Sequence, residues 1–173
     1  MEEMVIDTPN LQRVLDEYSL RFEELVKTKM ITPGRNGWNR VASGQLLASI
    51  KTRIDTLPGG IYEVYLQHLD YLKYIEFDTR PHFPPVKAIV KWVKDKRLPT
   101  RESTGNKALP TEKQLGFLVA RKISKFGTKG TPIVANTQEE LNAIYIPRLQ
   151  EALLEDAENA IRGQMIHIEL RFK

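Results

Sequence analysis

Apolar residues recur at spacings of three and four over the first part of the chain, which is typical of one face of an amphipathic helix. Thr8 and Pro9 precede this stripe and suit an N-cap and a first helical position. The pattern predicts a long helix from about residue 9 to Met30, ended by the turn sequence TPGRNG. The stripe consists of Leu11, Val14, Leu15, Tyr18, Phe22, Leu25 and Val26.

Two segments with period-two alternation flank the turn sequence PGG at residues 58–60. The first is IKTRIDTL and the second is IYEVYLQH, which is rich in β-branched and aromatic residues. Together they predict a β-hairpin. The final stretch, QMIHIELRFK, also alternates. It predicts a half-buried C-terminal strand that joins the hairpin in one sheet.

Between these strands the apolar period returns to that of a helix. SGQLLASI predicts a short helix before the hairpin, and a second short helix is expected at about residues 69–74, followed by extended chain. VKAIVKWVKDK predicts a helix over 86–96, and EKQLGFLVARKISKFG another that Gly127 ends. The intervening residues 97–111 have no apolar periodicity, so we expect an exposed, mobile loop there.

The last helix is predicted to begin at a capping box formed by Thr137 and Glu140. Pro147 lies inside it and should kink it or divide it in two. The elements together predict an α+β fold. Its small, mostly antiparallel sheet combines the hairpin with the C-terminal strand and is covered by the long N-terminal helix and further helices. A length of 173 residues suits a single domain over 1–173.

Composition removes several classes of chemistry. The chain has no cysteine, which excludes disulfides, thiolate metal sites and cysteine nucleophiles. It has no apolar run near the roughly 18–20 residues of a membrane span. The acidic start MEEMVIDTPN is not typical of a signal peptide. We therefore expect a soluble protein that is made in a cytoplasm and has no membrane partner.

The net charge of +4 is unevenly distributed. Residues 86–130 contain 12 Lys/Arg against 3 Asp/Glu, a net +9, and the remainder contains 14 against 19, a net −5. Such a basic segment suits an anionic partner, an acidic surface of a neighbouring subunit, or simply a solvated helical face. The candidate basic face consists of Lys91, Lys94, Arg121, Lys122 and Lys125.

Candidate catalytic groups are sparse. His68, His82 and His167 fall in separate predicted elements without metal-ligand spacing, and no nucleotide-binding or serine-nucleophile motif occurs. Glu76 and Asp78, with His82 nearby, form the one set that would suit acid–base catalysis. We nevertheless expect no catalytic residue, no metal and no cofactor, and keep an enzyme using these three residues as an alternative.

The segment IEFDTRPHFPP carries three prolines. Each proline holds φ at about −65° and biases the preceding residue toward extended geometry. The segment therefore predicts a stiff corner between extended residues 74–77 and the helix that starts at Val86. The candidate corner and interface residues are Glu76, Asp78, Thr79, Arg80, Pro81, His82, Pro84, Pro85 and Trp92.

Three collinear blocks carry a resemblance: ASGQLLASI, YLKYIEFDTRPHFPPVKAIVKWVKDK and LGFLVARKISKFGTKGTPIV. They resemble the bacteriophage neck and tail-completion family, the minor tail components of the head–tail junction, over about residues 42–134. That family usually has glycine in place of Asp78, which suggests a positive φ that aspartate tolerates. The matching positions are Tyr74, Glu76, Thr79 to His82, Pro84, Pro85, Trp92, Ala120 to Ile123, Gly127 and Thr128.

The resemblance implies an assembly protein without enzymatic activity. It implies a virion protein of the neck that forms a homo-oligomeric ring, contacts portal or adaptor and tail proteins, and lets DNA pass through its lumen. The basic segment would then face a neighbouring subunit or touch DNA non-specifically, and residues 97–111 would be an arm that orders on a partner. The alternative class is a small basic nucleic-acid-binding accessory protein that uses the aromatics interleaved in the basic segment.

Overall fold

The structure is a computed structural model that describes residues 7–34, 39–58 and 60–171. For residues 164–171 only the backbone is described, so the side chain of His167 lies outside the described part of the structure. The described chain has an α+β fold, with helices as the main component and one two-stranded antiparallel sheet.

The chain forms two compact units, each assembled from separate stretches of sequence. Unit 1 comprises Met1–Val26, Lys51–Gln67 and Ala135–Lys173. Unit 2 comprises Lys27–Ile50 and His68–Val134. The expectation that the whole chain acts as one domain stays a prediction.

Unit 1 holds the longest elements of the fold. Helix α1 (Pro9–Ile31) contributes its residues up to Val26, and helix α7 (Ile133–Arg171) contributes its residues from Ala135. Strands β1 (Lys51–Leu57) and β2 (Ile61–Gln67) form the hairpin, paired antiparallel from Lys51 opposite Gln67 to Leu57 opposite Ile61. The predicted N-terminal helix and the predicted hairpin are therefore confirmed.

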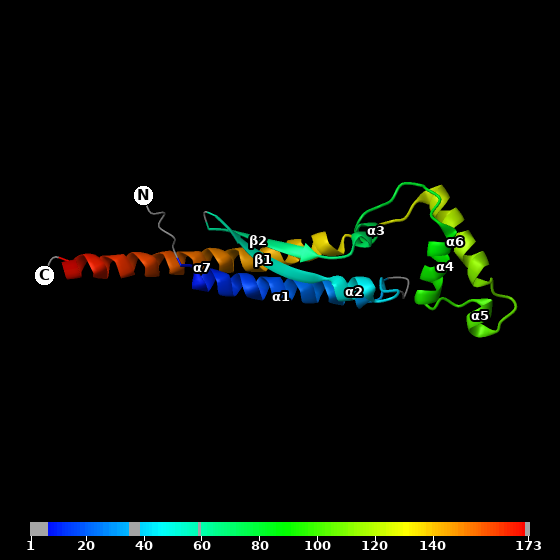
Figure 1. Cartoon of the computed structure of the whole chain (residues 1–173), viewed down its shortest axis with the longest axis horizontal. Coiled ribbons are helices and arrows are strands. Elements are labelled where there is room, and N and C mark those ends of the chain that lie inside the picture. Colours follow the sequence, from blue (N-terminus) through cyan, green and yellow to red (C-terminus); the bar gives the residue numbers. More distant parts are fainter. Residues whose placement is uncertain (1–6, 35–38, 59, 172–173) are drawn as a thin grey trace. The chain divides into compact units, whose positions relative to one another are not determined.

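Helices α1 and α7 lie side by side in unit 1 (Figure 1). Tyr18 of α1 packs edge-on against the ring of Tyr145, with ring centroids 5.5 Å apart, and its hydroxyl donates to Asn142 Oδ1 at 3.1 Å. An ion pair of 2.5 Å joins Glu17 to Arg148. The buried apolar core of unit 1 consists of Val14, Leu15, Tyr18, Phe22, Val26, Leu141 and Ala152.

The hairpin is attached to α1 through Thr52. Its hydroxyl is 2.7 Å from Ser19 Oγ, and its amide donates to Glu23 Oε2 at 2.9 Å. At the other end of the hairpin, the Tyr62 hydroxyl lies 2.5 Å from Thr8 Oγ1. Because these polar contacts lie at opposite ends of the hairpin, they fix how it runs along the helix.

The N-terminus of α1 is capped by a residue from the far end of the sequence. Asp156 of α7 is 2% exposed, and its carboxylate accepts from the amides of Asn10 and Leu11 at 3.2 and 2.9 Å. The Asn10 side chain donates to the same carboxylate at 2.8 Å. First-turn amides of a helix have no partner within it, and they are favourable neighbours for a negative charge. The expected cap position, Thr8, directs its hydroxyl to Tyr62 instead.

Unit 2 is built from short helices around a helix pair. Helices α4 and α6, which the apolar pattern of the basic segment predicted as separate helices, pack against each other. The extended chain after η1 and α3 forms the corner described below. The elements are α2 (Gln45–Ser49), η1 (Asp70–Leu72), α3 (Lys73–Glu76), α4 (Val86–Asp95), α5 (Arg101–Thr104) and α6 (Glu112–Phe126).

Gly116 sets how closely α4 and α6 approach. A Cβ atom at this position would lie 2.5 Å from Val90 Cγ2 and 3.3 Å from the Val90 backbone nitrogen. We therefore expect Gly116→Ala to lower the free energy of unfolding by about 1–2 kcal/mol, although alanine favours a helix over glycine. Urea denaturation would measure the change. In the double variant with Val90→Ala the closest atom, Val90 Cγ2, is absent, so part of the lost free energy of unfolding should be recovered. If Gly116→Ala alone raises the free energy of unfolding, the close approach of α4 and α6 is contradicted.

The predicted C-terminal strand is wrong, because α7 continues as a helix through Arg171. Alternation is a local pattern, whereas an existing helix gains one hydrogen bond for each residue added. Two other details of α7 also differ. The helix begins at Ile133, with Thr137 fully buried inside it, and Pro147 is accommodated without dividing it.

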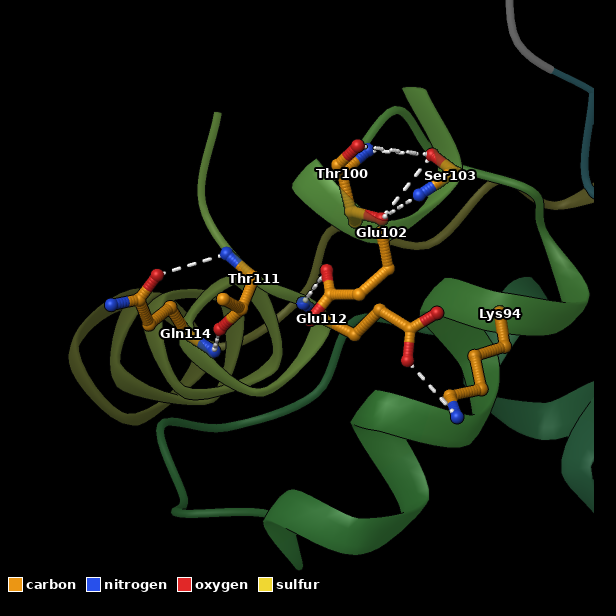
Figure 2. Close-up of polar contacts among 7 residues, drawn as sticks. All are labelled: Lys94, Thr100, Glu102, Ser103, Thr111, Glu112 and Gln114. Carbon is orange, nitrogen blue, oxygen red and sulfur yellow. Dashed lines mark hydrogen bonds and ion pairs between the residues drawn. The ribbon is translucent and has the colours of Figure 1, made fainter. Parts of the chain in front are cut away.

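Residues 97–111 contain more structure than their composition suggests (Figure 2). Thr100 is 1% exposed and forms a capping box with Ser103, which starts α5. Thr111 and Gln114 form a second capping box at the start of α6. The Glu102 carboxylate accepts from the amide of Glu112 at 3.0 Å, so α5 is tied directly to α6. The mobility of this segment stays a prediction, but it includes a capped helical turn.

Candidate functional site

The predicted corner of residues 74–85 pairs with the segment that follows α6. Thr79 and Thr128 form an isolated antiparallel bridge, in which the Thr79 amide donates to the Thr128 carbonyl at 2.9 Å. Their hydroxyls lie 2.7 Å apart, and the Thr128 amide donates to Thr79 Oγ1 at 3.0 Å. Two segments 49 residues apart in the sequence are thus joined by three hydrogen bonds.

Two glycines allow this close approach of the two backbones. Gly127 has a φ of +67°, and a Cβ atom there would lie 1.9 Å from the Thr79 carbonyl oxygen. A Cβ atom on Gly130 would lie 2.4 Å from the Phe77 carbonyl carbon. Gly127 is the C-cap of α6, as the sequence predicted, but its second role depends on a contact with a distant segment.

The two acids of the corner both accept hydrogen bonds from backbone amides. Asp78 Oδ1 accepts from Gly130 at 2.7 Å, and Glu76 Oε2 accepts from Val134 at 2.9 Å. Glu76 is 7% exposed and lies at the end of α3, so the predicted extended segment begins only at Phe77. The suggested positive φ at Asp78 is wrong, since Arg97 is the one non-glycine residue with positive φ in the described chain.

The prolines lead from this bridge into α4. Pro84 is buried, and Pro85 is the N-cap of α4 with φ −59°. Arg80 and Pro81 are outside the bridge, with Pro81 exposed, and the Arg80 carbonyl lies 2.8 Å from His82 Nδ1. The corner is therefore held by backbone pairing and by ring constraints, with no cluster of acids and histidine at its centre.

Beside the corner, unit 2 has an apolar groove of about 930 Å³. Aromatic residues of four elements, η1, α3, α4 and α6, line it, and Trp92 and Phe126 remain 40% and 75% exposed. Three cations contribute to its wall: Arg40, Lys122 and Lys129. Its apolar lining includes Leu46, Tyr74, Pro84, Trp92, Val119 and Phe126. We call this feature the unit 2 groove; the sequence had suggested Trp92 and His82 as corner residues, and both line it.

One wall of the groove is held by Lys96. Its Nζ donates to the carbonyl and side-chain oxygens of Asn39, each at 2.6 Å, and to the carbonyl of Val41 at 2.7 Å. Burial lowers the pKa of Lys96, and the nearby charge of Arg40 lowers it further. Lys96 thus attaches residues 39–41 to the end of α4.

The five predicted basic-face residues do not share one environment. Lys91 pairs with Asp95 at 2.8 Å, and Lys94 pairs with Glu112 at 3.0 Å (Figure 2). Arg121, Lys122 and Lys125 have no acidic partner among the described residues, and only Lys122 lines the groove. Among these five residues, the three without a described acidic partner all lie on α6.

The charge is divided between the two units more sharply than along the sequence. Unit 2 contains 18 Lys/Arg against 6 Asp/Glu, a net +12, whereas unit 1 contains 8 against 16, a net −8. The sums agree with the net +4 of the chain. Because these net charges are opposite, a surface of unit 1 and a surface of unit 2 attract each other, and salt weakens this attraction.

The described part of the chain contains no group of three or more His, Asp or Glu side chains that could hold a metal ion. Among the described helices, none is long and apolar enough to cross a membrane. The chain matches no protein-family model, no curated protein and no solved structure. Its candidate function therefore rests on the geometry of the corner and the groove.

Proposed function

We propose that this chain is a structural virion protein of a tailed phage that forms part of a homo-oligomeric ring at the head–tail junction, through which DNA passes. The observation that carries the proposal is the bridge between Thr79 and Thr128. It joins two of the three sequence blocks on which the resemblance to neck proteins depends. Residues of two blocks thus bind each other and hold the corner in place. Such a role suits a protein that holds its binding surfaces in fixed positions for assembly.

The environment of the acids supports a structural role over a catalytic one. Glu76 and Asp78 are used to bind the amides of Val134 and Gly130. An acid–base catalyst needs a proton-exchanging group that reaches a substrate in a cleft. The groove, in contrast, presents aromatic side chains, which are common where proteins bind other proteins.

The test is the particle produced by a phage genome from which this coding sequence is deleted. We expect DNA-filled heads and separate tails, with joining restored when the intact chain is supplied from a plasmid. Cryo-electron microscopy of the restored particles should place copies of the chain in a ring between portal or adaptor and tail. Normal infectious particles without the chain, or particles that lack it when it is supplied, would contradict the proposal.

A second candidate is a small basic nucleic-acid-binding accessory protein, which the net +12 of unit 2 favours. Arg121, Lys122 and Lys125 would contact phosphates, and such binding weakens steeply with salt. Fluorescence anisotropy with a single-stranded oligonucleotide at rising salt separates the candidates. Tight binding at physiological salt that is lost when these three residues become glutamine would favour the second candidate. Weak binding that disappears at physiological salt would favour the neck protein over the nucleic-acid-binding protein.

A further inference from the structure

Helix α7 carries an apolar surface that unit 1 leaves uncovered. Its members are 47–66% exposed, although each is a large aliphatic side chain. They follow one another at intervals of seven, one and seven residues, which brings them to one face of a helix with about 3.6 residues per turn. We call this face the α7 stripe; it consists of Ile146, Leu153, Leu154 and Ile161.

The α7 stripe lies on a different face from the one that packs in unit 1. Leu141, Ala152 and Asp156 are at most 4% exposed, and Asp156 binds the start of α1. Single exposed aliphatic side chains are common, but an aligned set on one helix is typical of an interaction site. The stripe is thus available for contact while the same helix supports unit 1.

An acidic row accompanies the stripe. Glu151, Glu155 and Glu158 are exposed and recur at intervals of four and three, so they form a neighbouring face of α7. Only Glu158 has a described cationic partner in this row, a loose 3.7 Å contact with Arg162 on the same helix. The surface offered by α7 is therefore aliphatic along one line and negative along the next.

The unit 2 groove has the matching properties. Its floor and sides are largely aromatic and aliphatic, and Lys122 and Lys129 are cations in its lining. An amphipathic helix that lays an apolar face into such a groove is a recurring mode of recognition. The opposite net charges of the two units, +12 and −8, favour this pairing between copies of the chain.

We propose that the α7 stripe of one copy docks in the unit 2 groove of a second copy, with the acidic row of α7 against Lys122 and Lys129. This inference rests on the proposed homo-oligomeric ring and identifies the surfaces that build it. The two surfaces differ, so the contact is heterologous, and each copy keeps one free stripe and one free groove. Repetition of such a contact closes into a ring when the rotation between copies permits it.

The absence of cysteine in the chain allows a direct test by disulfide crosslinking. Ala88→Cys places a thiol on the exposed lining of the groove, and Leu154→Cys places one on the stripe. When the two purified variants are mixed under mild oxidation, we expect a crosslinked heterodimer. Its yield should exceed by at least about tenfold that of Leu154→Cys mixed with Lys107→Cys, an exposed position outside the groove. Equal yields would overturn the docking.

A second measurement uses association without crosslinks. Leu154→Glu disrupts the stripe and Trp92→Glu disrupts the groove, and both side chains are partly exposed, so folding should survive. In sedimentation, each variant alone should self-associate at least about tenfold more weakly than the unmodified chain. Their mixture should form a 1:1 complex and nothing larger, because it retains one intact stripe and one intact groove. Variants that associate as the unmodified chain does would contradict the proposal.

The outcomes also separate this inference from the proposed function. If phage particles contain rings of the chain but Ala88→Cys and Leu154→Cys do not crosslink, the proposed neck function is retained and this contact is rejected. If the two cysteines crosslink specifically but phage particles lack the chain, the contact is retained and the neck function is rejected. If a single-stranded oligonucleotide occupies the groove and protects Ala88→Cys from thiol labelling, while no crosslink forms, the groove is a nucleic-acid site and the docking is rejected.

Discussion

Gly127→Ala is expected to lower the free energy of unfolding of unit 2 by about 4 kcal/mol, a loss at the upper end for a single substitution. Gly127 has φ +67° and ψ −162°, a backbone region that is essentially restricted to glycine, so a Cβ there costs about 1–3 kcal/mol. The new Cβ would also lie 1.9 Å from the Thr79 carbonyl oxygen, so the backbones must separate. That movement breaks hydrogen bonds between Thr79 and Thr128, each worth about 1 kcal/mol.

Urea denaturation gives the size of this effect, and amide hydrogen exchange gives its location. Exchange should accelerate in peptides that cover residues 77–80 and 127–130. Gly105→Ala is the control for positive φ without a close neighbour, because Gly105 has φ +72° and ψ −3° and nothing lies within 4 Å of its added Cβ. It should cost only the conformational part, about 1 kcal/mol. Equal losses in the two variants would mean that the corner does not depend on the close approach.

Asp156→Ala is expected to destabilise unit 1 by about 3 kcal/mol. The carboxylate is buried and accepts three hydrogen bonds from Asn10 and Leu11 at the start of α1. Its removal leaves first-turn amides without a partner in a place that water reaches poorly, and it removes a negative charge from the positive end of the helix. Thermal denaturation followed by circular dichroism measures the change.

Two further variants identify the cause. Asp156→Asn keeps one acceptor oxygen without the charge and should recover roughly half of the loss. Asp16→Ala removes an exposed aspartate of α1 whose only described contact is with Gln12, and it should change stability by less than about 0.5 kcal/mol. A small effect of Asp156→Ala would show that α1 finds another cap, for instance by turning Thr8 inward from Tyr62.

The main elements of the fold follow from short-range patterns. The apolar stripe of α1, the turn between β1 and β2, and the spacing of apolar residues in α4 and α6 each extend over enough residues to outweigh single exceptions. The predicted C-terminal strand was wrong because the pattern that predicted it extends over few residues and ignores the helix before it. Alternation within QMIHIELRFK is a local preference, and the helix that precedes this stretch continues through it as far as Arg171.

The corner was predictable only in part. Its prolines indicate a stiff turn in the sequence, and they lie before α4 as expected. The partner of that turn could not be predicted, because Thr128 is distant in sequence and no periodic pattern relates it to Thr79. The unit 2 groove was missed entirely, since it is assembled from helices that each present only one or two of its aromatic residues.

By itself, the sequence determined where the chain forms most of its helices and its hairpin, and where it turns, because these depend on backbone preferences and on neighbours within a few residues. Only the tertiary structure decided which carboxylates complete the helix starts: Asp156 for α1, Glu102 for α6 and Glu76 for α7. The sequence gives the charge and the length of each side chain, but it does not give the distance from that side chain to the first-turn amide of another helix. That distance arises when segments pack, and it places one candidate catalytic acid, Glu76, at the start of α7, where its carboxylate accepts from the amide of Val134.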